Sequence, residues 1–126
     1  MSGLPFLRNI SRPLAILNKE ITTHFADAFL PDTTPEQRRD PSISPFFADL
    51  YSMKLPPAIF LCGTDDCLLE DTVLMATRWQ LAGGETMMRL FPGAPHGFII
   101  APPDVSENAK EGLELIDQFL KEKMGF

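Results

Sequence analysis

The spacing of hydrophobic residues changes along the chain and divides it into 1–50 and 51–126. In the first part, apolar side chains recur at three- and four-residue intervals over 14–29, which is typical of an amphipathic helix. Pro13 precedes this stretch and Pro31 follows it, and proline commonly stands at the start of a helix or just beyond its end. The first part is therefore predicted to be a helix followed by a proline-rich loop.

Short continuous apolar runs appear in the second part. The run from Ala58 to Cys62 ends at Gly63, as expected of a strand that is buried on both faces of a parallel sheet. Asp71 and Thr72 then offer an N-cap for a helix, and a Gly-Gly pair ends that helix. This half of the pattern predicts a strand followed by a helix.

A second strand and a last helix complete the pattern. Residues 85–91 form another strand-like run that Pro92 and Gly93 end, and Ser106 is a suitable N-cap for a later helix. The order strand, helix, strand, loop, helix predicts an α/β fold whose parallel strands are joined by a crossover helix. The apolar stripe predicted for the last helix consists of Leu113, Ile116, Phe119 and Leu120.

Composition and charge remove several function classes. The 126 residues carry a formal net charge of −6, which disfavours binding to nucleic acid or to an anionic membrane surface. No apolar stretch approaches the roughly 20 residues that span a bilayer. Cys62 and Cys67 lie too close together to close a useful disulfide loop, so both are expected to be reduced thiols in a cytoplasmic protein. No phosphate-binding glycine loop or metal-ligand spacing is present, and we therefore expect no cofactor and no metal.

Candidate chemistry lies in the two loops that directly follow the predicted strands. The loop 63–71 supplies carboxylates, and the loop 91–98 supplies His96 among small residues. Functional groups collect at the carboxyl ends of parallel strands, so a carboxylate and this imidazole can meet if the strands are adjacent. Such a pair is the orienting half of a nucleophilic triad, in which the carboxylate fixes the tautomer of a histidine base.

Purely structural roles for the same residues remain open at this point. A histidine beside a glycine is often purely structural, and acidic residues after a strand often cap a helix and occupy its solvated first turn. A cation site built from Asp65, Asp66, Glu70 and Asp71 is disfavoured, because the glycine and spacing pattern of a calcium loop is missing.

Five stretches, in this order and with these separations, resemble the hormone-sensitive-lipase-like branch of the α/β-hydrolases, which contains many carboxylesterases. The resemblance runs from about Asp40 to Leu120. The stretches are Asp40-Pro41-Ser42-Ile43-Ser44-Pro45-Phe46-Phe47-Ala48-Asp49-Leu50, Leu55-Pro56-Pro57-Ala58, Gly63-Thr64-Asp65-Asp66, Ala82-Gly83-Gly84 and Pro92-Gly93-Ala94-Pro95-His96-Gly97-Phe98.

The resemblance implies roles for individual residues. The family's acid lies in an Asp-Pro-Leu-x-Asp motif after the penultimate strand, which points to Asp66 rather than Asp65 as the catalytic acid. The family's His-Gly-Phe motif points to His96 as the catalytic histidine. Cys67 replaces the motif's proline and Glu70 its second aspartate, and these departures make the acid's loop less rigid.

The same resemblance implies an architecture. Residues 51–126 would be the C-terminal portion of an α/β-hydrolase core, comprising its last two parallel strands and their helices, and 1–50 would be a cap-like helix and loop segment. By analogy, Phe46, Phe98 and Ile99 would line an apolar acyl pocket, and packing in the core is an equally good interpretation for each.

The family's serine nucleophile is missing from the printed sequence. No serine stands in Gly-x-Ser-x-Gly, and no His-Gly-Gly oxyanion-hole segment occurs. We therefore expect the acid and histidine half of a carboxylic-ester hydrolase, acting on a small acyl ester once an N-terminal half completes it. The alternatives are a non-catalytic module for assembly or one that binds an apolar ligand without turnover. Because two strands alone leave an open sheet edge, the free chain is expected to be marginally stable or to self-associate.

Overall fold

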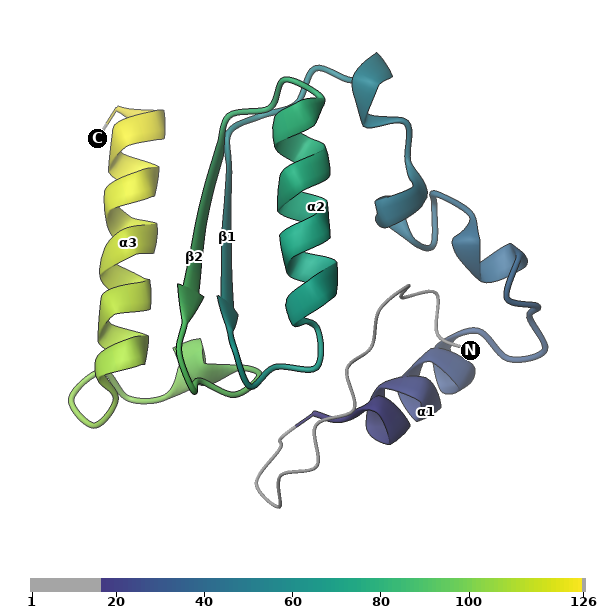
Figure 1. Cartoon of the computed structure of the whole chain (residues 1–126), viewed down its shortest axis with the longest axis horizontal. Helices are drawn as coiled ribbons and strands as arrows, with labels where there is room; N and C mark the ends of the chain where they lie inside the picture. The colour runs from purple at the N-terminus through teal and green to yellow at the C-terminus, as the bar shows by residue number, and fades with distance from the viewer. Residues whose placement is uncertain (1–16, 126) are drawn as a thin grey trace.

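Two parallel strands form the sheet of this protein (Figure 1). In the computed structural model, which describes residues 17–125, β1 spans Ala58–Gly63 and β2 spans Thr86–Phe91. Helix α2 (Leu69–Leu81) connects the two strands, α3 (Glu107–Met124) follows the second, and the strands lie between these helices in Figure 1. The α/β fold with a crossover helix, expected from the sequence, is confirmed.

The register of the two strands brings their carboxyl ends together. Ala58 pairs with Thr86 at the start, and Gly63 pairs with Phe91 at the end. Both loops that carry candidate chemistry therefore leave the sheet side by side. The core sits at this end, where Phe91, Ala94 and Phe98 are buried together.

Burial of β1 is less complete than the sequence predicts. Cys62 and Gly63 are buried, whereas the preceding four residues of the strand are only half-buried. Within the described part of the chain, β1 has one neighbouring strand, β2, and its other edge has none. A strand reaches full burial only when both faces and both edges are covered, so the predicted burial holds at the carboxyl end alone.

The first turn of α2 corrects the predicted N-cap. The helix begins at Leu69, so Asp71 is not its cap but a buried residue of the first turn. The turn ahead of the helix is closed by Asp66, whose Oδ1 accepts a hydrogen bond from the Leu68 N–H at 2.9 Å. An acidic residue in the first turn still suits the positive end of the helix dipole.

Helix α3 begins as predicted, but its buried face differs from the predicted stripe. The Ser106 side chain caps the helix by accepting from the Ala109 N–H. Leu113 and Leu120 are each 41% exposed, so their assignment to the buried stripe was wrong. The buried residues of the helix are Ala109, Gly112 and Phe119. The reason is close packing: a Cβ on Gly112 would lie 2.5 Å from the Ile99 Cδ1 atom, so the smallest residue faces the loop after β2.

Helix α1 (Lys19–Phe29) is shorter than the predicted helix. Asn18 caps it, and its side-chain oxygen accepts from the Ile21 N–H at 2.9 Å. The predicted start at 14 lies outside the described residues. Phe25 and Phe29 are exposed, and the buried residue of the helix is Thr22, whose Oγ1 lies 3.9 Å from the sulfur of Cys67. Helix α1 therefore contacts the loop that follows β1.

A connection without long helices joins α1 to β1. It contains the short 3-10 helices η1 (Gln37–Arg39), η2 (Pro45–Phe47) and η3 (Leu50–Ser52). Arg38 is buried and donates to Asp27 Oδ1 at 2.6 Å and to the carbonyl oxygen of Leu30 at 3.1 Å. The guanidinium group lowers the pKa of Asp27 through this hydrogen bond. The assignment of 1–50 to a cap stays a prediction.

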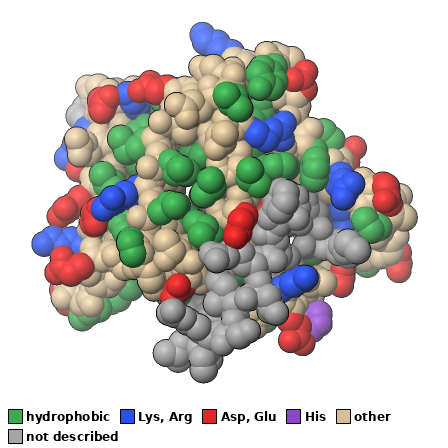
Figure 2. All heavy atoms as spheres, viewed as in Figure 1, with side chains coloured by type: hydrophobic (Ala, Val, Ile, Leu, Met, Phe, Trp, Pro, Cys, Tyr) green, Lys and Arg blue, Asp and Glu red, His purple; other side chains and the backbone are tan. Residues whose placement is uncertain are grey.

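The surface shows apolar side chains between charged ones. Figure 2 shows hydrophobic side chains gathered near the middle of the face seen in Figure 1, with charged side chains mostly around them. In the part of the chain that the structure describes, no helix combines the length and the apolar character that a membrane crossing requires.

Candidate active site

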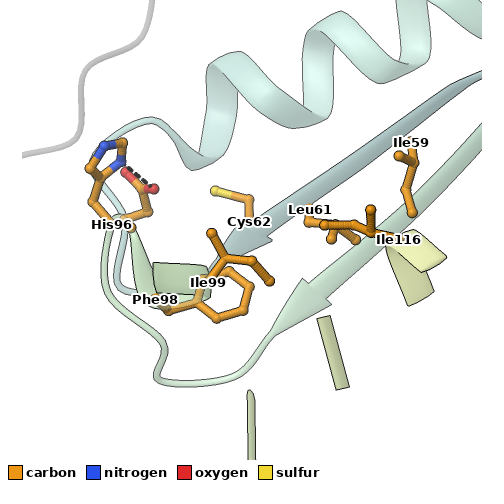
Figure 3. A pocket seen from close by; sticks show the side chains of 9 residues that line it. Ile59, Leu61, Cys62, His96, Phe98, Ile99 and Ile116 are labelled. Carbon is orange, nitrogen blue, oxygen red and sulfur yellow. Dashed lines mark hydrogen bonds and ion pairs between the residues drawn. The ribbon is translucent and has the colours of Figure 1, made fainter. Parts of the chain in front are cut away.

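Asp66 and His96 contact each other directly (Figure 3). The distance from His96 Nδ1 to Asp66 Oδ2 is 2.8 Å. Asp66 lies in the loop after β1, and His96 lies in the loop after β2, so the parallel register brings the two together. Because a carboxylate can only accept a hydrogen bond, the ring donates from Nδ1, which in the neutral imidazole leaves the lone pair on Nε2.

The two partners differ in their exposure to solvent. The Asp66 side chain is 8% exposed and the His96 ring is 38% exposed. Both carboxylate oxygens of Asp66 are engaged, since Oδ1 accepts from the Leu68 N–H and Oδ2 faces the ring. A buried acid with both oxygens engaged thus orients an imidazole whose side chain is partly exposed to solvent.

Hydrogen bonds between the two loops hold this arrangement. The Thr64 N–H donates to the Phe91 carbonyl oxygen at 2.9 Å, and the Asp65 N–H donates to the Ala94 carbonyl oxygen at 3.1 Å. The Gly93 N–H donates to Thr64 Oγ1 at 2.8 Å. Two main-chain hydrogen bonds and one to a threonine side chain therefore join the acid loop to the histidine loop.

The histidine loop rests on the core of the protein. Gly97 has φ +71°, a left-handed conformation that glycine adopts at low cost, and it turns the chain into the short helix η4 (Phe98–Ile100). The ring of Phe98 packs against Phe91 with 4.6 Å between the ring centroids. This packing joins the segment that carries His96 to the buried core.

A pocket of about 340 Å³ lies beside the pair and is lined mainly by apolar side chains (Figure 3). Phe98 and Ile99, two of the three residues predicted to contact substrate, line it. Phe46 is not among its lining residues; it lies on η2, where its ring centroid is 5.0 Å from the Arg78 guanidinium carbon. The other lining residues are Ile59, Leu61, Cys62, Gly97 and Ile116, together with Asp66 and His96.

The sequence analysis did not assign Ile59 or Leu61 to a site. Ile59 and Leu61 are two positions apart on β1, and alternate residues of a strand share a face, so the period of the strand was the available signal. Ile116 comes from α3, and its place in the pocket depends on how that helix packs, which local spacing does not reveal.

The two cysteines near Asp66 are free and buried. Burial raises the pKa of the Cys62 thiol to about 11, and burial likewise raises the pKa of Cys67. Both are therefore neutral thiols near pH 7, which makes them poor nucleophiles. Among the residues that the structure describes, no three His, Cys, Asp or Glu side chains come together in a way that could hold a metal ion.

Two curated proteins are similar to this chain in sequence. An AB hydrolase superfamily protein of Schizosaccharomyces pombe is 28% identical over 99 residues, which cover 79% of this chain and 29% of that protein. The ethyl acetate hydrolase of Pseudomonas putida is 29% identical over 92 residues, covering 73% of this chain and 28% of that protein. The chain thus matches less than a third of the length of each of these relatives.

Solved esterases have the same arrangement of elements. EstE1, a thermostable carboxylesterase cloned from a metagenomic library, matches with a TM-score of 0.78 at 26% identity over 90% of this chain and 37% of that one. An esterase from the bacterial hormone-sensitive lipase family matches with a TM-score of 0.73 at 27% identity over 85% of this chain and 34% of that one. The family model for the alpha/beta hydrolase fold matches residues 8–100. This chain belongs to the α/β-hydrolase fold family.

Proposed function

We propose that this chain supplies the acid and the histidine of a Ser-His-Asp triad in a carboxylic-ester hydrolase. The observation that carries the proposal is the 2.8 Å contact between Asp66 Oδ2 and His96 Nδ1. It leaves Nε2 free to accept a proton from a nucleophile, on a side chain that is 38% exposed. A pair of this kind acts on a serine hydroxyl that is presented to Nε2.

The chemistry assigned to each residue follows from the geometry. His96 Nε2 takes the proton of a serine hydroxyl as the oxygen attacks the ester carbonyl, and then returns that proton to the departing alkoxide. Asp66 keeps the ring in the tautomer with a free Nε2 and stabilises the imidazolium that forms. Neither residue forms a covalent bond to the acyl group in this scheme.

The nucleophile is proposed to come from outside these 126 residues. The four serines that the structure describes have local contacts: Ser42 with Asp40, Ser44 with the Arg38 carbonyl oxygen, Ser52 with the Asp49 carbonyl oxygen, and Ser106 as the cap of α3. None of them lines the pocket beside His96. These contacts support a structural role for each of the four hydroxyls.

A small or medium acyl ester is the proposed substrate class. The apolar pocket beside His96 has a volume of about 340 Å³, which suits a short hydrocarbon group. Similarity to an ethyl acetate hydrolase and to carboxylesterases supports the same class. The cytoplasmic location stays a prediction from the sequence.

The chain alone is expected to leave p-nitrophenyl acetate and p-nitrophenyl butyrate unhydrolysed above the buffer rate, because none of the serines that the structure describes lines the pocket beside His96. A fluorophosphonate probe is expected to leave every serine unlabelled. Mass spectrometry of the treated chain and initial rates at pH 7.5 measure both. Turnover together with a labelled serine within the chain would contradict the proposal that the nucleophile lies elsewhere.

We also propose that the open edge of β1 associates with a second strand, which in the isolated chain comes from another copy. The Ala58 N–H donates to the Glu85 carbonyl oxygen and the Thr64 N–H donates to the Phe91 carbonyl oxygen, so alternate residues from 58 face β2. The main-chain groups of Ile59 and Leu61 then face the other edge, where an unpaired strand favours association.

Substitution of Ile59 by proline is expected to weaken self-association at least tenfold and to leave the fold intact. Proline removes an N–H that faces away from β2, together with a side chain that lines the pocket, and prolines are tolerated at such edge positions. Phe60→Pro is the contrasting variant, because it removes an N–H that faces β2 and is expected to unfold the chain. Sedimentation equilibrium over a range of concentrations measures the association. A wild-type chain that stays monomeric at every concentration would contradict the proposal.

A further inference from the structure

Thr64 joins the two loops of the active site through its side chain. It follows β1 directly, and its Oγ1 accepts a hydrogen bond from the Gly93 N–H at 2.8 Å across 29 residues of sequence. Its own N–H donates to the Phe91 carbonyl oxygen, so both contacts reach the turn that follows β2. Thr64, which lies two residues before Asp66, therefore contacts the loop that carries His96.

The turn at Gly93 presents a main-chain N–H to that hydroxyl. Gly93 has φ +71°, and the turn is closed by the Ala94 N–H, which donates to the Phe91 carbonyl oxygen at 3.2 Å. The Gly93 N–H points out of the turn and toward β1. Thr64 Oγ1 accepts this N–H at the surface of the molecule, so the hydrogen bond ties the turn after β2 to the end of β1.

We propose that Thr64 is a positioning residue of the active site: its hydroxyl holds the Gly93 turn against the acid loop and so keeps His96 Nδ1 within hydrogen-bonding distance of Asp66. The catalytic consequence rests on the proposed function, but the contact itself can be tested in this chain. Misplacing a catalytic group by 1 Å can cost about 100-fold in rate, so a single hydrogen bond that fixes the two loops relative to each other can affect the rate.

The test compares Thr64→Val with Thr64→Ser in the full chain labelled with ¹⁵N. Valine has nearly the shape of threonine but no acceptor, whereas serine keeps the hydroxyl. The first readout is hydrogen exchange at the Gly93 amide. The second is the NMR signal of the proton on His96 Nδ1, which is visible only while that proton is held in a hydrogen bond. His96→Gln and His24→Gln assign this signal.

Thr64→Val is expected to speed exchange at Gly93 at least tenfold and to broaden or remove the Nδ1 proton signal. Thr64→Ser is expected to keep both near wild type. Thr77→Val is the matched control, because the Thr77 hydroxyl donates to the Val73 carbonyl oxygen within α2 and touches neither loop. Thr64→Ala, which also lacks the hydroxyl, is the second variant should Thr64→Val fail to give a dispersed amide spectrum.

The outcomes separate this inference from the proposed function. A wild-type chain without the Nδ1 proton signal would overturn both, since the pairing of Asp66 and His96 would then be missing in solution. A wild-type signal that persists unchanged in Thr64→Val and Thr64→Ala would overturn the role of Thr64 alone. Loss of the signal in Thr64→Ser as well would show that the methyl group, and not the hydroxyl, carries the effect, and would also overturn it.

Discussion

Replacing His96 with alanine in a completed enzyme is expected to lower kcat by about 10⁴-fold or more, because the serine loses its only base. The completed enzyme is a chimera that joins the upstream part of EstE1 to residues 17–126 of this chain. EstE1 suits the purpose because its TM-score with this chain is 0.78 over 90% of the chain. Initial rates of p-nitrophenyl butyrate hydrolysis by the chimera and its variants measure the effect.

Asp66→Asn is expected to cost about 10⁴-fold in the same chimera, since an amide in place of the carboxylate holds the ring in the wrong tautomer. Asp65→Asn is the matched control: its backbone N–H, and not its carboxylate, makes the contact to Ala94 that holds the loops. Its rate is expected to stay within about threefold of the parent, as for a substitution outside the catalytic groups. His24→Ala, at an exposed position on α1, is expected to do the same.

Two results would contradict the assignment of the dyad. One is an active chimera whose rate is unchanged by Asp66→Asn or by His96→Ala. The other is a chimera in which a fluorophosphonate labels a serine as fast with His96→Ala as with the parent sequence. A folded chimera that binds ester but never turns it over would instead favour a binding module.

The parts of this fold that local sequence predicts are those that depend on nearest neighbours along the chain. The apolar run to Cys62 and the glycine after it mark the first strand, and the hydroxyl of Ser106 caps the last helix where expected. The position of both loops at one end of the sheet follows from parallel pairing alone. This is why the contact between Asp66 and His96 could be anticipated before any geometry was known.

The features that sequence misjudged depend on tertiary contacts. Asp71 is a residue type that often caps helices, yet the turn ahead of α2 is closed by Asp66, three residues before the helix begins. The Asp66 side chain is held there by its contacts with Leu68 and His96. Leu113 has the right spacing for a buried stripe, yet the packed face of α3 is set by Gly112, which admits Ile99. The role of Phe46 in substrate binding stays a prediction; its ring lies near the Arg78 guanidinium, a contact for which local sequence carries no signal.

Gly63→Ala is expected to destabilise the chain by about 3 kcal/mol or more, because the added methyl group meets main-chain atoms that have no room to yield. The new Cβ would lie 1.9 Å from the carbonyl oxygen of Ala94 and 2.5 Å from its carbonyl carbon. Urea unfolding followed by the fluorescence of Trp79, at a concentration where the chain is monomeric, measures the loss. Trp79 is a suitable reporter because its Nε1–H donates to the Pro56 carbonyl oxygen in the native fold.

The matched control for this substitution is Gly93→Ala. Gly93 has φ +71°, and no neighbouring atom lies within 4 Å of the place that a Cβ would take, so alanine there meets strain in the backbone but no clash. That strain costs about 1–2 kcal/mol. Gly63→Ala should exceed it, and it should also weaken the pairing of His96 with Asp66, because the clash falls on the Ala94 oxygen that accepts from the Asp65 N–H. A loss at Gly63 no larger than that at Gly93 would mean that the two loops separate easily, and that the close approach of Gly63 to Ala94 does not hold the catalytic pair together.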